Sequence, residues 1–409
     1  MKDEKIVGSF QLMKSLNKSL ILNTIRTHGS ISRSDIAKET KLTPPTVTNI
    51  VNELLEEGLV KEWQTGSSSG GRKPILLKIN SSNFYVFGID ISPREIRFAI
   101  TDLNAQTLLY KTITMKEEMT SSRLFQMIAK QLYIMMDEAC IELKKFVGIG
   151  IGIHGRIDAD EGSSGFAPQL QHRNVPLKKE LEKEFRLPVK IENDVRAMAI
   201  GENWFGSGVG ISNLVCIKIS HGVGAGFILN KKLFHGTNGL AGEIGHMFIE
   251  SSGLKCSCGN DGCLEALVGS EGIKQRTLNK ISLGYKTKLI ERTNGMIENV
   301  NGQLIYEAAL EGDLLAKDIL EETGRYLGIA IMNIIHLFNP ERIIIGGGLA
   351  KAKNFILTPI QEVVEQRALT EQAKKTEIVL SKLGDQATVI GAVALVLNEM
   401  FSVQYESVS

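Results

Sequence analysis

The first eighty residues contain short segments in which apolar positions follow helical spacing. In the segment 20–25 these positions share one helix face, and Gly29 follows as a residue that favours the left-handed end of a helix. A second short helix is predicted from Ser32 to about Thr40, because Ser32 and Asp35 can satisfy free N–H groups in a first turn. The spacing therefore predicts two helices joined by a tight turn.

A third helix is predicted to begin at Thr43, because the two prolines after it are tolerated only at a helix start. Its apolar positions form one buried stripe, and Gly58 ends it. The opposite face carries hydroxyl and amide side chains, which approach base edges and phosphates closely: Thr46, Thr48, Asn49 and Asn52. This arrangement is typical of a DNA-binding helix-turn-helix, and a small helical bundle without DNA is the alternative.

Two predicted strands, 59–63 and 75–79, follow and are joined by a loop rich in glycine and serine. The hairpin has the position of a wing, whose cations can reach a phosphate or a narrow minor groove. A plain solvated hairpin loop is the alternative. The complete set of predicted DNA contacts is Ser32, Arg33, Thr43, Thr46, Thr48, Asn49, Asn52, Arg72 and Lys73.

From residue 84 onward, strand patterns alternate with helical patterns in two series. The first comprises strands 85–91, 96–102, 107–114 and 147–153 and a helix at about 121–143. The second comprises strands 214–219, 226–229 and 342–345, a long helix ending near Phe338 and a last helix at about 385–400. The two series predict a duplicated α/β architecture with a cleft between lobes. We expect a winged helix at 1–80 and a two-lobed α/β domain at 81–409, with lobes at 84–195 plus the last helix and at 196–385.

The composition fits two or three domains with a substantial core. Of 409 residues, 43% are hydrophobic and 23% are charged, and the mean hydropathy is +0.00. No apolar run is long enough to cross a bilayer and the amino terminus has no apolar signal core, which predicts a cytoplasmic protein without a membrane partner. The net charge is +1, but residues 1–80 hold 12 Lys/Arg against 8 Asp/Glu, which adds weak support for a nucleic-acid partner.

Three of the five cysteines lie within eight residues: Cys256, Cys258 and Cys263. This spacing fits a metal site in a reducing compartment better than a disulfide framework. His246 lies ten residues before the first of them, and three thiolates with one imidazole complete a closed tetrahedron for a structural Zn²⁺. Three buried or redox-active cysteines are the alternative. Cys140 and Cys216 follow apolar patterns and are predicted to be core residues.

Polar residues that a structural zinc does not need surround this cluster. Glu243 and Glu265 flank the predicted metal ligands. Upstream, a predicted strand delivers Asn193 and Asp194 to the start of a helix at about 195–204, and ligands of open α/β sheets bind at such strand ends. Carboxylates and an amide suit a polyhydroxyl ligand, since each hydroxyl both donates and accepts. The alternative is that Asp194 is only a helix cap.

Taken together, these residues resemble the ROK family of repressors and sugar kinases over nearly the whole chain. The resemblance rests on segments 193–194, 222–226, 242–246 and 346–348 and on the cysteine cluster that runs into Leu264-Glu265. The amino-terminal part is similar to the family's repressor branch, especially to xylose-operon repressors. The resemblance implies an actin-like, ribonuclease H-like fold of two lobes.

The resemblance also implies roles for individual residues. In the family's kinases, the residue matching Asp194 is the general base, and the imidazole matching His246 contacts both zinc and sugar. Gly155 lies in the family's sugar loop, with His154 in place of a proline. The implied sugar contacts are Gly155, Asn174, Asn193, Asp194, Glu243, His246 and Glu265, and the implied zinc ligands are His246, Cys256, Cys258 and Cys263.

The sequence departs from the kinases at the first phosphate loop. Where they carry Asp-x-Gly-Gly-Thr, this chain has Asp90 to Glu95 without a glycine. Glycines let N–H groups close on a phosphate, Pro93 lacks such a donor, and Glu95 adds negative charge. We therefore expect a sugar-responsive repressor that is not an enzyme. An ATP-dependent sugar kinase is the alternative, because Asp194 and the 222–226 run are retained.

The expected partners are a palindromic operator DNA and a monosaccharide that releases the protein from it. Xylose and glucose are the favoured sugars, and an amino sugar is a further candidate. The symmetry of such an operator predicts a homodimer or a tetramer of paired dimers. In some family members a component of a sugar phosphotransferase system replaces the free sugar as inducer, and this alternative stays open.

Overall fold

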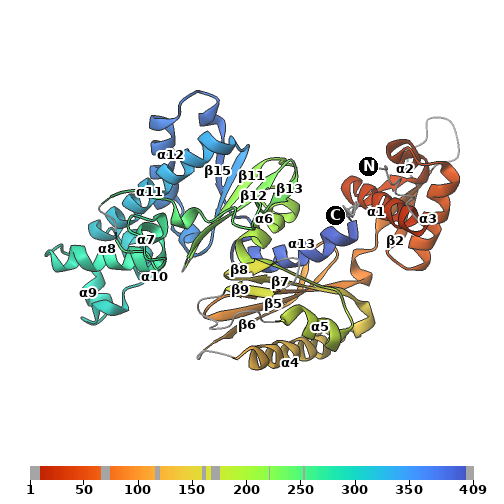
Figure 1. Ribbon diagram of the computed structural model, residues 1–409, viewed down its shortest axis with the longest axis horizontal. Helices are drawn as coiled ribbons and strands as arrows, with labels where there is room; N and C mark the ends of the chain where they lie inside the picture. Colours follow the sequence, from red (N-terminus) through yellow and green to blue (C-terminus); the bar gives the residue numbers. More distant parts are fainter. Residues whose placement is uncertain are drawn as a thin grey trace, which may run out of the picture.

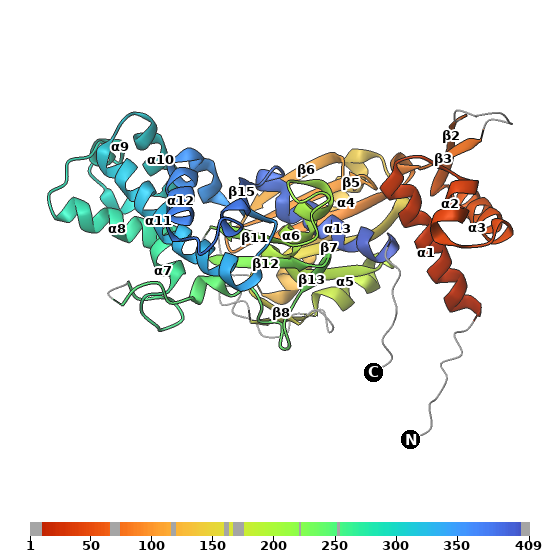
Figure 2. The same ribbon diagram turned by 90° about the horizontal axis from the view of Figure 1, so that it is seen from above.

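The computed structural model describes residues 10–65, 74–115, 120–158, 163–166, 176–220, 222–251 and 254–401. Within these ranges the chain forms an amino-terminal head and two α/β lobes, which follow one another along the long axis (Figure 1). The last helix, α13 (Ala387–Phe401), ends beside the first helix, α1 (Phe10–His28), in both views (Figures 1 and 2). The first and last of the helices that the structure describes therefore meet at the junction between the head and the lobes.

The head contains the three predicted helices and the predicted hairpin. Its elements are α1, β1 (Ile31–Ser32), α2 (Arg33–Thr40), α3 (Pro44–Glu56), β2 (Val60–Thr65) and β3 (Ile75–Ile79), and the sheet order is β1-β3-β2. Gly29 has a φ of +69° after the end of α1, and Thr43 caps α3 ahead of the two prolines, as predicted. The helix and strand order is that of a winged helix-turn-helix.

The first lobe is a five-stranded sheet with helices on both faces. The strand order is β10-β7-β4-β5-β6, with β4 (Tyr85–Ile91), β5 (Glu95–Asp102), β6 (Thr107–Thr114), β7 (Phe146–Ile153) and β10 (Val189–Asn193). The helices α4 (Ser121–Ala139) and α5 (Leu177–Phe185) pack on this sheet (Figure 1), and a small ribbon joins β8 (Arg156–Asp158) to β9 (Ser163–Phe166). Phe87 and Phe146 stack at a centroid distance of 3.9 Å within the core.

One helix of this lobe ends earlier than predicted. The pattern predicted a helix to residue 143, but Cys140 adopts the left-handed conformation at φ 54° and its N–H closes the last turn on the Asp137 and Met136 carbonyls. Cys140 is exposed at this cap, so its prediction as a core residue is wrong. Cys216 is buried, as predicted.

The second lobe repeats the topology of the first. Its strand order is β13-β12-β11-β14-β15, with β11 (Leu214–Ile219), β12 (Val223–Leu229), β13 (Lys232–Phe234), β14 (Arg342–Gly346) and β15 (Glu377–Leu380). In each sheet three antiparallel strands are followed by two parallel ones. The duplication that the pattern predicted is therefore present in the sheets.

The helices of the second lobe lie between its third and last strands in sequence. They are α7 (Leu264–Val268), α8 (Ser270–Ser282), α9 (Leu289–Arg292), α10 (Gly302–Leu310), α11 (Leu314–Phe338) and α12 (Asn354–Arg367). The helices α8, α9 and α10 form the end of the molecule opposite the head (Figure 1). None of the helices in the described part of the chain is long and apolar enough to span a membrane.

Two helices fill the layer between the sheets. The helix α13 packs on the first sheet, and α6 (Asp194–Phe205) packs on the second. Glycines allow their backbones to approach closely: a Cβ on Gly391 would lie 1.9 Å from the carbonyl oxygen of Ala197, and one on Gly201 2.7 Å from the Gly391 nitrogen. The pair therefore has no room for larger side chains at this crossing.

The head packs against the carboxyl ends of α6 and α13. Apolar residues of the head share one core with α13, including Ile25 and Leu397. The guanidinium of Arg26 lies over Trp204 of α6 at 4.2 Å and over Phe401 of α13 at 5.6 Å. The joint thus connects α1 directly to both helices of the layer between the lobes.

Candidate functional site

The predicted pair Asn193 and Asp194 lies where β10 ends and α6 begins. Asn193 is the helix cap, since its Oδ1 accepts from the N–H groups of Val195 and Arg196 at 3.0 and 3.2 Å. Its Nδ2 donates to Asp194 Oδ1 at 3.2 Å and to the carbonyl oxygen of Gly155 at 3.1 Å. Because Asn193 caps the helix, the Asp194 carboxylate has other partners, and the alternative that Asp194 is only a cap is wrong.

A sharp turn after β7 brings two further residues to this point. Gly155 has a φ of +108°, which residues with a side chain rarely adopt. The preceding His154 donates its backbone N–H to the carbonyl of Ile91 at 2.9 Å, and its imidazole Nδ1 lies 3.7 Å from Asp194 Oδ2. The structure therefore brings Gly155, Asn193 and Asp194 together and adds the imidazole of His154.

Asp194 is a buried carboxylate that pairs with the cation of Lys218. Only 3% of its surface is exposed, and Lys218 Nζ lies 2.8 Å from its Oδ2. Burial alone would raise the pKa of Asp194, but the charge of Lys218 and the neighbouring imidazole of His154 lower it below its usual range. The nearby Asp194 carboxylate in turn raises the pKa of His154. Asp194 is therefore held as a carboxylate that accepts hydrogen bonds.

The cysteine cluster folds into a compact knuckle. Gly262 has a φ of +73°, and a Cβ there would lie 2.0 Å from the carbonyl oxygen of Glu250. Gly242 precedes the turn that carries the histidine, and a Cβ there would lie 1.9 Å from the Ala225 carbonyl oxygen. A residue with a side chain could not be accommodated at either of these close approaches.

The donor atoms of the knuckle have the separations of a tetrahedral metal site. The ligand atoms of His246, Cys256, Cys258 and Cys263 all lie within 4.8 Å of one another. The sulfurs of Cys258 and Cys263 are 3.8 Å apart, and Cys256 Sγ is 3.6 Å from His246 Nδ1. For Zn–S bonds of about 2.3 Å and Zn–N bonds of about 2.0 Å, the edges of a tetrahedron are about 3.8 Å and about 3.5 Å. The residues therefore fit a metal ion of this coordination.

Glu265 ties the knuckle to the sheet of the second lobe. It lies in the first turn of α7, directly after Cys263 and Leu264. Its Oε2 accepts from the N–H of Val223 at 3.1 Å, and its Oε1 accepts from the hydroxyl of Ser257 at 3.1 Å. A displacement of the knuckle would therefore also displace Val223 at the start of β12.

Gly222 lies between the predicted sugar residue Glu265 and His154, the neighbour of Gly155. A Cβ on Gly222 would lie 3.1 Å from Glu265 Oε2 and 3.5 Å from His154 Cε1. Glu243 and His246 are exposed on the turn that precedes the knuckle. If Nδ1 of His246 faces the metal, its Nε2 is free to bond a ligand. The predicted contact Asn174 lies outside the described residues.

Beyond Asp194 the lobes enclose a cavity of about 350 Å³. The turn from β4 to β5 forms one wall of this cavity. In this turn the N–H and the hydroxyl of Ser92 both donate to the carbonyl oxygen of Glu95, at 3.0 and 2.8 Å. Arg97 pairs with Asp90 at 3.3 Å and also with Glu95. This turn is closed on itself, so it offers few of the free N–H groups that hold a phosphate.

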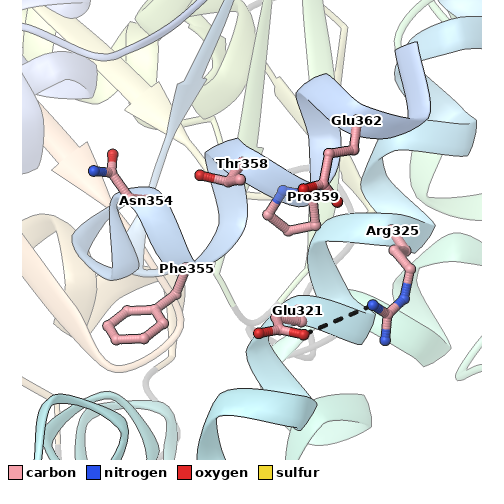
Figure 3. Close-up of a pocket in the computed structure, with 7 residues that line it drawn as sticks. All are labelled: Glu321, Arg325, Asn354, Phe355, Thr358, Pro359 and Glu362. Carbon is pink, nitrogen blue, oxygen red and sulfur yellow. Dashed lines mark ion pairs between the residues drawn. The ribbon is translucent and has the colours of Figure 1, made fainter. Parts of the chain in front are cut away.

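Figure 3 shows a second pocket, of about 340 Å³, between α11 and α12. Arg325 and Glu321 line it and pair at 3.8 Å along α11. On the α12 side, Pro359 lies against Gly324, where a Cβ would come within 2.4 Å of the proline ring. None of the predicted site residues that the structure describes lines this pocket.

The head presents the predicted polar face of α3 to solvent. Thr43, Thr48, Asn49 and Asn52 are exposed, and Thr46 is half-buried. Arg33 pairs with Glu62 at 3.4 Å. Ser32 is only 2% exposed, and its hydroxyl caps α2 by accepting from the N–H of Asp35 at 3.2 Å, so its position is that of a structural cap. The predicted wing contacts Arg72 and Lys73 lie outside the described residues.

Sequence reasoning missed Lys218 and Thr388, which complete the surroundings of Asp194. Lys218 Nζ donates to Thr388 Oγ1 at 3.0 Å as well as to Asp194. The available signal was a lysine inside the apolar strand Leu214–Ile219, since a charge in such a strand needs a partner. Its partners lie 24 and 170 residues away in sequence, and no local pattern identifies them.

Known proteins match both parts of the chain. A model described as ROK family matches residues 86–399, and one described as winged helix-turn-helix DNA-binding matches residues 15–61. The xylose repressor of Caldicellulosiruptor bescii is 34% identical over 396 residues, which cover 97% of this chain and 99% of the relative. The sequence match therefore includes the head as well as the lobes.

Solved structures give the same result. A ROK family transcriptional regulator, a homolog of the E. coli MLC protein, superposes with a TM-score of 0.84 at 30% identity and covers 95% of this chain and 98% of its own. A ROK family glucokinase from Streptomyces griseus, in complex with glucose and AMPPNP, has a TM-score of 0.66 at 28% identity and covers 76% of this chain and 98% of its own. With the ROK model spanning most of the chain and a relative aligned over nearly its full length, this protein belongs to the ROK family.

Proposed function

We propose that this protein is a sugar-responsive transcriptional repressor, in which the winged helix binds operator DNA and a monosaccharide between the lobes weakens that binding. The proposal rests on one combination: a recognition helix with exposed threonine and asparagine side chains is joined to a pocket of polar groups around Asn193 and Asp194. The relative named a xylose repressor supports the assignment. We assign residues 1–80 to DNA binding and 81–409 to sugar sensing.

The sugar pocket comprises Gly155, Asn174, Asn193, Asp194, Glu243, His246 and Glu265 in this proposal. Carboxylate and amide groups suit sugar hydroxyls, which both donate and accept. The sugar itself is xylose, glucose or an amino sugar. The same pocket would serve a kinase, but the closed turn at Ser92 and the ion-paired Asp194 favour binding without phosphoryl transfer.

Zn²⁺ is the proposed occupant of the knuckle, held by His246, Cys256, Cys258 and Cys263. When bound, it acts as a structural cross-link between two turns. Two residues then connect the knuckle to the sugar pocket. Glu265 links the knuckle to β12, and the imidazole of His246 presents its second nitrogen to the sugar. Its removal would therefore loosen the sugar pocket along with the knuckle.

The route from the sugar to the DNA follows α6 and α13. Asp194 begins α6, and Trp204 near its other end contacts Arg26 of α1. From α1, Lys14 and Lys18 pair with Glu53 and Glu57 at the end of the recognition helix at 2.8 and 2.6 Å. A change in how the lobes hold α6 therefore changes the orientation of the head. A hundredfold loss of DNA affinity requires a coupling of only about 2.7 kcal/mol.

A palindromic operator implies two heads related by a two-fold axis, so we propose a homodimer, or dimers that pair again. Half-site centres would be separated by about 34 Å or a multiple of it. The test is operator binding by the purified protein, measured by fluorescence anisotropy with and without D-xylose, D-glucose and N-acetyl-D-glucosamine. Sugar-dependent release supports the proposal. Rapid ATP-dependent phosphorylation of a sugar would favour the kinase instead. If only a phosphotransferase protein released the DNA, that protein and not the sugar would be the inducer.

A further inference from the structure

Lys218 occupies a position that the sugar-binding assignment does not use. It projects from β11 of the second lobe and is only 9% exposed. Its ammonium group donates to Asp194 Oδ2 at 2.8 Å and to Thr388 Oγ1 at 3.0 Å. These partners begin α6 and lie near the start of α13, the two helices of the layer between the lobes.

The ammonium group has one donor left. A lysine ammonium carries three N–H groups and no acceptor. Asp194 and Thr388 take two of them, and no third acceptor is found among the described residues. Lys218 and Asp194 both line the cavity of about 350 Å³ between the lobes. The remaining N–H is therefore next to open space that a ligand can enter.

A second unpaired group lines the same cavity. Asp90 has no exposed surface, and its Oδ1 has no hydrogen-bond partner among the described residues. Burial raises the pKa of this carboxyl group. The Asp90 side chain therefore adds a further polar group to the wall of the cavity beside Lys218.

The Lys218–Asp194 pair offers one donor and one acceptor side by side. A hydroxyl both donates and accepts, so it can satisfy the two groups at once. A carboxylate oxygen offers an acceptor only, and an amine offers mainly donors. We propose that Lys218 is a sugar-binding residue, and that it and Asp194 together recognise one hydroxyl of the effector sugar.

This inference rests on the proposed sugar-sensing function and makes it more specific. The hydroxyl that a kinase would activate at Asp194 is here bound by a carboxylate and an ammonium group. A hydrogen bond to a charged group contributes about 1.5–3 kcal/mol. Removing that single hydroxyl from the sugar should therefore weaken binding by about 10- to 100-fold.

The experiment is a double-mutant-type cycle, in which the change at Lys218 is combined with the removal of single hydroxyl groups from the sugar. Calorimetry first finds which of D-xylose, D-glucose and N-acetyl-D-glucosamine binds most tightly, and then measures its series of monodeoxy analogues. In the wild-type protein one analogue should lose about 10- to 100-fold in affinity. In Lys218→Met this discrimination should fall by about tenfold, while the ratios among the other analogues stay as in the wild type.

Two controls keep the result interpretable. Lys351→Met removes another lysine of the cavity wall, which pairs with Asp385 at 2.9 Å, and should leave the discrimination unchanged. Lys218→Met leaves Asp194 as an unpaired buried charge, so Lys218→Met with Asp194→Asn provides a neutral pair if the single variant does not fold. This double variant should lose nearly all discrimination at the one hydroxyl.

The inference is overturned if Lys218→Met, or the neutral pair, retains the wild-type discrimination. It is also overturned if the variant binds every analogue more weakly by the same factor, because a uniform loss indicates a purely structural role. Failure of the wild-type protein to bind any of the three sugars is a different outcome. It would reject the proposed sugar-sensing function, and with it the sugar-binding role of Lys218.

Discussion

The joint between the head and the lobes should control the response to sugar. We predict that Arg26→Met separates sugar binding from DNA release. Arg26 lies over the rings of Trp204 and Phe401, and its guanidinium is held by Asn23 Oδ1 at 2.9 Å. Methionine keeps the apolar stem and removes the charge, so the packing of α1 is preserved.

The size of the effect follows from these contacts. A cation over an aromatic ring contributes about 0.5–1 kcal/mol when exposed and about 2 kcal/mol when desolvated. Arg26 is partly buried against two rings, so its loss weakens the joint by about 1–2 kcal/mol. Since 1.4 kcal/mol corresponds to a factor of ten, a hundredfold sugar effect on DNA affinity should fall to about tenfold.

Two measurements test this prediction. Anisotropy with a duplex selected by the wild-type protein from random sequences gives DNA affinity with and without sugar, and calorimetry gives sugar affinity. Arg26→Met should keep both separate affinities within about threefold of the wild type while the sugar effect on DNA binding falls. Arg325→Met, a change at an exposed arginine of α11, is the matched control. An unchanged sugar effect in Arg26→Met would refute the joint as the route of coupling.

Three further predictions follow from the recognition helix, the knuckle and the helix crossing. Thr48→Ala and Asn49→Ala should each weaken binding to the selected duplex by about 1–3 kcal/mol per lost base contact and leave binding to random DNA nearly unchanged, as competition titrations would measure. Cys258→Ser should lose bound zinc and the sugar response together. Mass spectrometry should show the loss of the metal, and calorimetry should show the loss of sugar affinity. Full sugar affinity in a zinc-free variant would contradict the role of the metal as a cross-link. Gly391→Ala should lower the unfolding free energy by about 1–3 kcal/mol in denaturant titrations because the added methyl meets the Ala197 carbonyl, and an unchanged midpoint would show that the crossing can relax.

The amino-terminal head could be predicted almost completely from its sequence. The cap at Thr43, the prolines after it and the left-handed Gly29 act within one turn of chain, and the structure reproduces the helix starts and ends they predict. The knuckle was predictable for a similar reason. Its three cysteines are close in sequence, and glycines with positive φ leave few ways to arrange them.

The sequence was less informative where a residue could satisfy its pattern in two ways. Cys140 continued an apolar stripe but became a left-handed cap, because one turn of helix more or less changes little in the pattern. Ser32 combined a cap with a predicted DNA contact, and in the structure its hydroxyl is buried in the cap. Short helices of the second lobe, such as α7 and α9, have too few residues for a clear period.

Local chemistry therefore came from the sequence by itself: the helix caps, the metal-ligand spacing, the polar pair at the end of a strand and the altered phosphate turn. The partnership of Lys218 with Asp194 and Thr388, and that of Arg26 with Trp204, depend on segments that are far apart along the chain. Only the packing of two sheets about α6 and α13 brings them within contact distance. Charges and rings act over a few ångströms of space, whatever their separation in sequence, and for this reason tertiary structure alone decided which carboxylate is paired and which helix meets the head.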